Sequence, residues 1–169
     1  MSEKPASQFV YVTYIRATPE KVWAALIEPK FLKQYWLGAL PEAEWKLGGA
    51  WKIGFPNGVV ADTGEIVEFE PGRRLAIKWH NEKPELKAEG WSLCTMEVEP
   101  VNKPGGVATR LTVTHSIDRA ESKLIAAVSG GWSQILSNLK SLLENGSAML
   151  DAPVNEHCVG RQVLEAARA

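Results

Sequence analysis

The chain has 169 residues, which suits one domain with a short tail. Its formal net charge of −1 gives no electrostatic reason to expect nucleic acid or an anionic membrane surface as a partner. The sequence has no apolar run near the roughly 18 residues of a membrane span, and its two cysteines make no disulfide framework, so a reducing, cytoplasmic location is expected.

Residues 9–36 predict one strand followed by two short helices. The segment FVYVTYI, residues 9–15, alternates polar with apolar side chains and is rich in β-branched and aromatic residues, as strands are. Thr18 then suits the N-cap of a helix, and Pro19 suits its first turn. Pro29 ends this helix and can open the second one.

The middle of the chain has the pattern of strands joined by short turns. The segments with period-2 or β-branched character are 42–55, 59–70, 73–80, 91–100 and 106–116. Gly48-Gly49 divides the first segment, so the run contains about six strands. Their connections are short and rich in Gly, Pro and Asn, which predicts an antiparallel meander of hairpins. The longer connection, residues 81–90, is polar enough to predict a solvated loop.

One face of these strands is apolar and the other is polar. The apolar face carries Leu75, Ile77 and Trp79, then Cys94, Met96 and Val98, then Leu111, Val113 and His115. A sheet with one apolar face needs a covering element. The amphipathic helix predicted between residues 124 and 143 is the only element long enough, and Asn145-Gly146 supplies its C-terminal stop.

These elements divide the chain into an N-terminal extension (1–8), one domain (9–146) and a tail (147–169). The tail has an apolar stripe near its end, and we expect part of it to be helical. That stripe can dock on the domain or on a second subunit, so a homodimer is one expectation.

The combination of segments resembles a known family. The segments are ATPEKVWAAL, PKFLKQYW, TGEIVEFEPGRRLAIKW, TRLTVTHS and GGWSQILSNLKSLLE. In this order and spacing they are similar to the activator of heat-shock protein 90 ATPase homologue family, within the START-like helix-grip (SRPBCC) superfamily that includes the birch-pollen allergen fold. The resemblance implies an α+β helix-grip fold: a curved antiparallel sheet of six to seven strands wrapped around a long C-terminal helix, with two short helices after strand 1.

The resemblance also implies an apolar cavity between the sheet and the long helix. We expect its lining to be Tyr35, Trp36, Val67, Phe69, Ile77, Trp79, Met96, Val113, His115, Val128, Gly131, Trp132 and Ile135. Gly130 and Gly131 are unusual inside a helix, because each weakens it by about 1 kcal/mol relative to alanine. One interpretation is that they allow another group to approach the helix backbone closely beside the cavity, or allow the helix to kink there. The other is that they only make room for a bulky sheet residue such as Trp79.

Candidate catalytic groups are few. The histidines and cysteines have no metal-ligand spacing, and the glycine pairs have no phosphate-loop context, so we expect no metal and no cofactor. His115 points inward by alternation, either as a polar group toward a ligand or as a buried histidine satisfied by its surroundings. Glu65 alternates in step with Val67 and Phe69, so its side chain would also face inward. A single β-bulge in this strand would reverse that orientation.

Three functions are consistent with these patterns. The first, which we favour, is binding of a hydrophobic or aromatic small molecule without covalent chemistry. The second is a cyclase, aromatase or dehydratase that would use His115 with an inward acid such as Glu65. The third is a chaperone-interacting regulator with a role in the stress response. Chaperone-stimulating proteins carry a separate N-terminal domain with an Asn-x-x-Asn-Trp-His-Trp motif, which this sequence lacks, so we do not expect ATPase activation.

Overall fold

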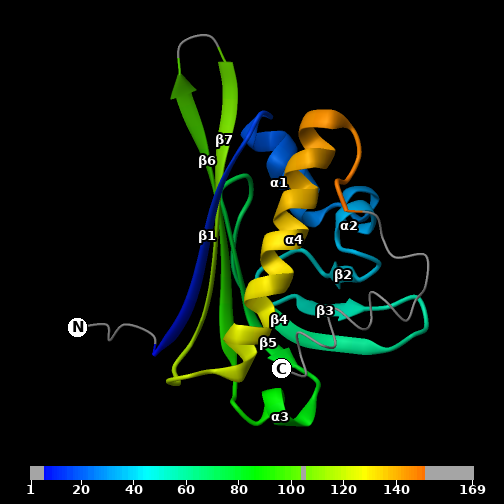
Figure 1. Cartoon of the computed structure of the whole chain (residues 1–169), viewed down its shortest axis with the longest axis vertical. Coiled ribbons are helices and arrows are strands. Elements are labelled where there is room, and N and C mark those ends of the chain that lie inside the picture. The colour runs from blue at the N-terminus through cyan, green and yellow to red at the C-terminus, as the bar shows by residue number, and fades with distance from the viewer. Residues whose placement is uncertain (1–5, 104–105, 151–169) are drawn as a thin grey trace.

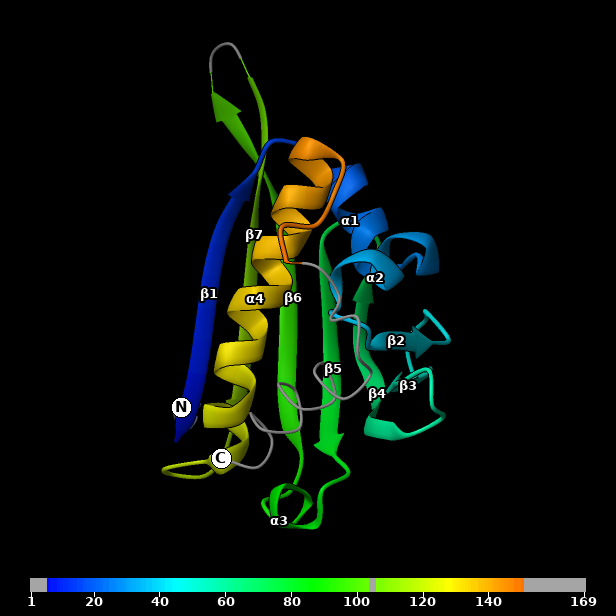
Figure 2. The same cartoon turned by 45° about the vertical axis from the view of Figure 1, so that its right-hand side comes forward.

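The computed structural model describes residues 6–103 and 106–150, and these form one curved antiparallel sheet gripping a long helix (Figures 1 and 2). The elements in chain order are β1 (Ser7–Ile15), α1 (Pro19–Ile27), α2 (Pro29–Tyr35), β2 (Leu40–Ala43), β3 (Ala50–Gly54), β4 (Val60–Glu70), β5 (Arg74–Asn81), α3 (Pro84–Lys87), β6 (Ser92–Lys103), β7 (Gly106–Ile117) and α4 (Lys123–Asn145). The strand order in the sheet is β1-β7-β6-β5-β4-β3-β2. The predicted helix-grip fold is confirmed.

The two short helices form where the sequence predicts them. The Thr18 hydroxyl accepts a hydrogen bond from the Lys21 backbone N–H at 3.2 Å and so caps α1. Proline opens both α1 and α2. The Tyr35 hydroxyl donates to the Ala25 carbonyl at 2.7 Å, which fixes the end of α2 against α1.

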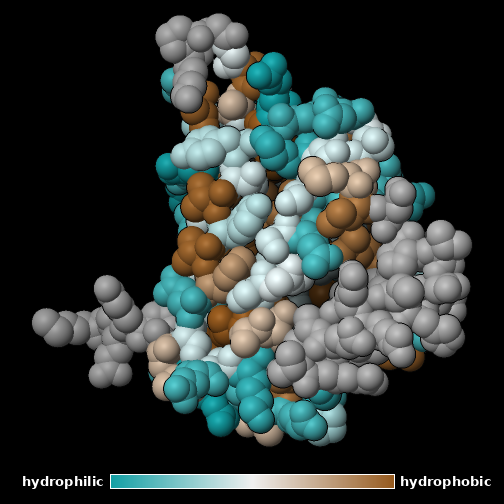
Figure 3. All heavy atoms as spheres, viewed as in Figure 1, coloured by the Kyte–Doolittle hydropathy of each residue, from teal (hydrophilic) through white to brown (hydrophobic). Residues whose placement is uncertain are grey.

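The long helix α4 lies across the concave face of the sheet and runs without a break from Lys123 to Asn145 (Figure 2). Ser122 caps its N-terminus, and Gly146, with φ of 87°, ends it in the left-handed conformation that glycine adopts freely. Its buried side includes Leu136 and Leu139. The middle of its other side is rich in small residues, and in Figure 3 it runs as a pale stripe between brown side chains of neighbouring elements.

The predicted inward parity is confirmed on the three adjacent strands β5, β6 and β7. Cross-strand partners in β6 and β7 are Cys94 with His115, Met96 with Val113, and Val98 with Leu111. All six of these side chains are buried beneath α4 or the short helices, with Cys94 and His115 fully inaccessible. Alternate residues of β6 and β7 therefore face the core, from Cys94 to Val98 and from Leu111 to His115.

The inward orientation predicted for Glu65 and Val67 is wrong, because β4 contains an irregularity. Its register with β5 shifts between Ile66 and Glu68, so one extra residue is inserted at this point. Glu65 is consequently exposed and Ile66 is fully buried instead. Val67 lies half-buried beside Lys78 on the outer face.

The segment 81–90 is not a solvated loop. It contains α3, whose Leu86 is only 1% exposed, and its first residue, Asn81, is buried as well. Glu89 turns back toward α4, where its carboxylate accepts from the Ser122 hydroxyl at 2.6 Å and the Lys123 N–H at 3.0 Å. The segment therefore closes the lower end of the molecule beneath the start of α4 (Figure 1). The prediction of a partly helical tail falls mostly on residues 151–169, outside the described residues.

Candidate functional site

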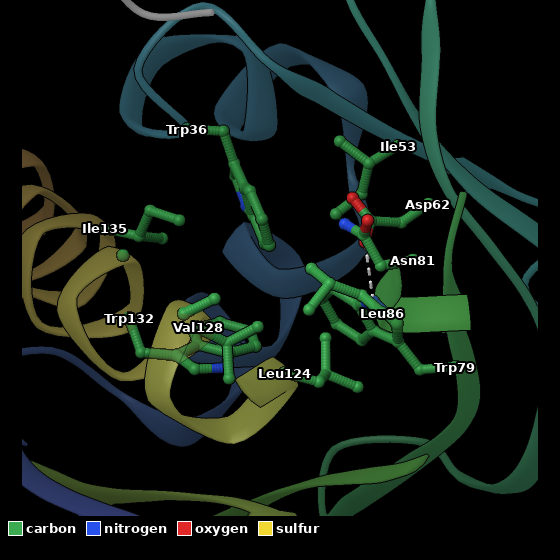
Figure 4. Close-up of a pocket in the computed structure, with 12 residues that line it drawn as sticks. Trp36, Ile53, Asp62, Trp79, Asn81, Leu86, Leu124, Val128, Trp132 and Ile135 are labelled. Carbon is green, nitrogen blue, oxygen red and sulfur yellow. Dashed lines mark hydrogen bonds between the residues drawn. The ribbon is translucent and has the colours of Figure 1, made fainter. Parts of the chain in front are cut away.

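A pocket lies where the first half of α4 meets the ends of β4 and β5, with α3 below it and the residue after α2 above it (Figure 4). Its volume is about 60 Å³. The residues that line it are Trp36, Ile53, Asp62, Trp79, Asn81, Leu86, Leu124, Ala127, Val128, Gly131, Trp132 and Ile135. All are apolar or glycine except Asp62 and Asn81, which lie together on one side.

Three tryptophans from different elements form the aromatic walls of this pocket. Trp79 comes from β5, Trp132 from α4, and Trp36 from the residue directly after α2. The Trp132 ring meets the other two edge-on, with centroids 5.9 Å from Trp79 and 5.5 Å from Trp36. Behind Trp79 lies Trp51, with ring centroids 4.4 Å apart.

Glycine at position 64 is required for this stack. A Cβ on Gly64 would lie 2.0 Å from the Lys78 carbonyl oxygen and 3.3 Å from the Trp51 ring. Gly64 pairs directly with Trp79 across the β4–β5 ladder. The missing side chain therefore lets Trp51 pack over β4 and support the Trp79 wall from behind.

Two of the three indole walls are fixed by hydrogen bonds from their ring nitrogens. Trp79 Nε1 donates to Asp62 Oδ1 at 2.9 Å, and Trp132 Nε1 donates to His115 Nδ1 at 3.2 Å. Trp36 Nε1 is buried and forms no hydrogen bond of ordinary geometry with the described residues, although its interaction with the Tyr35 hydroxyl opposes the rise that burial causes in the Tyr35 pKa. Trp79 and Trp132 are therefore held in place, whereas Trp36 lacks a comparable anchor.

Asp62 provides the charged group of the pocket and is only 4% exposed. Its Oδ1 accepts from Trp79 and also from Asn81 Nδ2 at 2.8 Å. The Asn81 amide is oriented by the Lys83 backbone N–H, which donates to its Oδ1 at 3.0 Å. Burial raises the pKa of Asp62 from 3.8 to about 6, while the two hydrogen bonds oppose that rise and the nearby charge of Glu82 adds to it.

His115 lies behind the walls and does not line the pocket. Its Nδ1 accepts from Trp132, so the neutral ring carries its hydrogen on Nε2, which lies 2.8 Å from the Ser92 hydroxyl. Ser92 in turn donates to the Trp79 carbonyl at 3.1 Å. Burial lowers the pKa of His115 to about 3. Both ring nitrogens are occupied, and the residue positions Trp132.

The structure brings together about half of the predicted cavity residues in one pocket. Those that line it are Trp36, Trp79, Val128, Gly131, Trp132 and Ile135. Tyr35, Ile77 and Met96 line a smaller adjoining cavity of about 10 Å³, which lies on the other side of Trp36 and Trp132. Val113 is buried in the sheet, and Phe69 packs against Trp23, with ring centroids 5.6 Å apart.

Asp62, Asn81 and Leu86 were missed by the sequence prediction. Asp62 lies on the inward face together with Ile66. Because of the irregularity at Val67, counting alternate residues back from Phe69 places Glu65 on that face instead. Asn81 and Leu86 belong to the segment interpreted as a solvated loop. A usable signal was Leu86 itself, an aliphatic residue two positions after a proline in an otherwise polar connection.

Gly130 and Gly131 have different surroundings. Gly130 is exposed, whereas Gly131 is half-buried and lines the pocket. Apart from its chain neighbours and the nearby backbone of α4 itself, a Cβ built on either glycine meets no atom of the described residues within 4 Å. The glycines therefore neither kink α4 nor make room for a sheet residue, and at Gly131 the absent side chain leaves open space that belongs to the pocket.

The described residues contain no group of three or more His, Cys, Asp or Glu side chains placed to hold a metal ion. Within residues 6–103 and 106–150, no helix is long and apolar enough to cross a membrane.

Comparisons with known proteins agree with this architecture. A family profile described as Activator of Hsp90 ATPase homolog 1-like protein matches residues 16–144. No curated protein matches the sequence. Among solved structures, protein MLL2253 from Mesorhizobium loti is 24% identical with a TM-score of 0.67, and the match covers 81% of this chain and 96% of that one.

Two further solved structures share this fold. The Aha1 dimer from Colwellia psychrerythraea is 22% identical, with a TM-score of 0.65 and coverage of 83% of this chain and 98% of that one. PFC0360w from Plasmodium falciparum, described as an HSP90 activator, is 23% identical, with a TM-score of 0.62 and coverage of 80% and 95%. At these identities the likeness establishes the fold.

Proposed function

The chain belongs to the Activator of Hsp90 ATPase homolog 1-like family, and we propose that it uses this fold to bind a small hydrophobic molecule in the pocket between the sheet and α4. The observation that carries this proposal is the composition of the pocket. Apolar and aromatic side chains surround it, and a buried carboxyl and an amide form one polar side. Ligand sites of proteins commonly combine an apolar wall with a few fixed polar groups.

Preorganisation of the walls supports the same proposal. Hydrogen bonds hold Trp79 and Trp132, and the Asn81 amide holds the carboxyl of Asp62. A ligand that enters such a site orders few side chains, so little of its binding energy is lost to conformational entropy. Gly131 keeps open a space that any larger residue would fill.

The volume of the pocket limits the size of the ligand. Drug-sized ligands occupy pockets of roughly 300–1,000 Å³, whereas this pocket measures about 60 Å³. With all three tryptophans in place it suits a compact molecule of a few carbon atoms. Trp36 and Trp132 separate it from the smaller cavity, so displacement of the unanchored Trp36 would join the two spaces.

The catalytic alternative has less support. Glu65 is exposed on the solvent side, and the two ring nitrogens of His115 are already bonded to Trp132 and Ser92. A general base needs a free nitrogen within reach of the substrate. Interaction with a chaperone and a role in the stress response stay predictions, for which we identify no specific supporting surface.

Titration with 1-butanol, followed by the indole N–H signals in ¹H–¹⁵N NMR spectra, tests the proposal. NMR detects the weak binding expected for so small a ligand. We expect the signals of Trp36, Trp79 and Trp132 to shift in a saturable manner. Trp91, which is 45% exposed, provides an internal reference for nonspecific effects.

Substitution of the two adjacent glycines locates the binding site. Gly131→Leu places a side chain in the pocket, and Gly130→Leu places the same side chain on the exposed side of α4. Both changes raise helix propensity, by about 0.8–1 kcal/mol, so both variants should fold. We expect only Gly131→Leu to abolish the shifts. Equal binding by both variants, or no saturable shift in the unmodified protein, would overturn the proposal.

A further inference from the structure

The carboxyl group of Asp62 has one oxygen without a partner. Both of its hydrogen bonds, from Trp79 Nε1 and Asn81 Nδ2, end on Oδ1. Oδ2 accepts no hydrogen bond from residues 6–103 and 106–150. Asp62 as a whole is only 4% exposed, and polar groups buried to this extent in native proteins are nearly always bonded. The open acceptor belongs to a group that lines an otherwise apolar pocket.

The charge of Asp62 is also uncompensated within the described part of the chain. The charged residue that acts most directly on it is another acid, Glu82. Glu82 does not line the pocket, and its own carboxylate is bonded to the Thr63 hydroxyl at 2.5 Å and to Lys87 Nζ at 2.9 Å. None of the described lysines, arginines or histidines forms an ion pair with Asp62. A buried carboxylate normally requires a positive partner.

We propose that the ligand of this pocket is a small amine bound as its ammonium ion, with an N–H group donating to Asp62 Oδ2 and the hydrocarbon part lying among Trp36, Trp79 and Trp132. This inference rests on the proposed ligand-binding function and specifies the chemistry of the ligand. An ammonium group supplies both the missing donor and the missing positive charge. The indole faces add a favourable interaction with a cation that no neutral ligand gains.

The arrangement of the pocket fits such a molecule. In Figure 4, Asp62 and Asn81 stand across the space from the ring of Trp36, while Leu86, Leu124 and Val128 lie below. A primary amine can therefore place its charged end at the polar side and its alkyl chain against apolar side chains. An alcohol of the same length makes the same apolar contacts but brings no charge.

The test compares butylamine hydrochloride with 1-butanol at pH 7.5 and matched ionic strength. The readout is the set of indole N–H signals, and Trp79 is the most sensitive reporter because it donates to the same carboxyl group. A charge-assisted hydrogen bond exceeds a neutral one by enough to predict that the protein binds butylamine about tenfold more tightly than 1-butanol, or more.

Two variants assign the preference to Asp62. Asp62→Asn retains an oxygen that can accept from Trp79 and Asn81 but has no charge, so it should bind both compounds equally. Glu82→Gln removes a negative charge from the same neighbourhood outside the pocket and should keep the preference.

The outcomes separate this inference from the proposed function. Equal binding of butylamine and 1-butanol by the unmodified protein, or an amine preference that persists in Asp62→Asn, would overturn the amine ligand and leave hydrophobic binding intact. Failure of both compounds to bind would overturn both proposals. The comparison within the unmodified protein decides the question even if Asp62→Asn does not fold.

Discussion

The ionisation of Asp62 depends on the fold. Its pKa is raised from 3.8 to about 6 by burial, so the folded protein binds this proton more tightly than the unfolded chain does. Its contribution to stability is therefore fully present below pH 3.8 and is lost as the pH rises through about 6. The ionised carboxylate of Asp62 therefore destabilises the folded protein at neutral pH.

Asp62→Asn should remove this destabilisation. Asparagine cannot ionise, so the variant does not lose this stability as the pH rises. The unfolding free energy of the variant minus that of the unmodified protein should therefore be about 2–3 kcal/mol higher at pH 7 than at pH 4. Urea denaturation at both pH values measures this difference. Glu82→Gln separates the smaller effect of the neighbouring charge. A relative stability that does not change with pH would contradict the placement of Asp62.

His115 should remain neutral throughout the physiological range. Burial lowers its pKa from 6.5 to about 3, so its contribution to stability is present above pH 6.5 and is lost as the pH falls toward 3. We expect its ring resonances to stay constant between pH 5 and pH 8. Burial and the nearby charge of Lys87 lower the pKa of His80, which stacks on the exposed Trp91, so His80 should titrate at lower pH than a free imidazole but at higher pH than His115. Titration of His115 near pH 6.5 would instead support the acid–base alternative.

The N-terminus of α4 depends on a residue from outside the helix. Glu89 accepts from the Ser122 hydroxyl, from the Lys123 N–H and, at 3.1 Å, from the Leu124 N–H. A carboxylate at this end satisfies free N–H groups and complements the helix dipole. We expect Glu89→Ala to lower the unfolding free energy by about 1–2 kcal/mol.

Glu85→Ala is the matched control for the cap. Glu85 lies on α3 with its side chain 68% exposed, so its loss should change the unfolding free energy by less than about 0.5 kcal/mol. Chemical denaturation of both variants provides the comparison. Equal effects would show that Glu89 does not anchor α4 in solution.

Trp36 controls how much space α2 and α4 leave between them. Trp36→Leu should join the main pocket to the cavity lined by Tyr35 and Met96. We therefore expect this variant to bind 1-hexanol relatively better than 1-butanol, compared with the unmodified protein, because the longer chain can extend into the second cavity. NMR titration with both alcohols measures the ratio. An unchanged ratio would mean that Trp36 does not separate the two spaces.

At the scale of the whole molecule, the order of elements and the helix-grip architecture follow from the sequence. Hydrophobic period, capping residues and turn residues are local signals, so Thr18, Pro29 and Gly146 mark helix ends correctly. Alternation also places the inward residues of β5, β6 and β7, since no irregularity interrupts them there.

The site is less predictable because it depends on contacts between distant segments. The irregularity at Val67 arises from the pairing of β4 with β5, which the local sequence does not reveal. Because of it, Asp62 rather than Glu65 faces the pocket. Leu86 is buried only because α4 begins above it. The sequence also gives no sign that Trp132 Nε1 donates a hydrogen bond to His115 whereas Trp36 Nε1 lacks a partner of ordinary geometry, because this difference depends on tertiary neighbours. A homodimer stays a prediction, which sedimentation velocity can test.

The central claim is that an accessible apolar pocket lies between α4 and the sheet, and a crystal structure determined under xenon pressure tests it most directly. Xenon enters small apolar cavities without forming hydrogen bonds, so its position does not depend on the identity of the natural ligand. The account predicts a xenon atom beside Gly131, between Trp36 and Val128, that is absent from Gly131→Leu and retained in Gly130→Leu. Well-ordered crystals with no xenon between α4 and the sheet would contradict it.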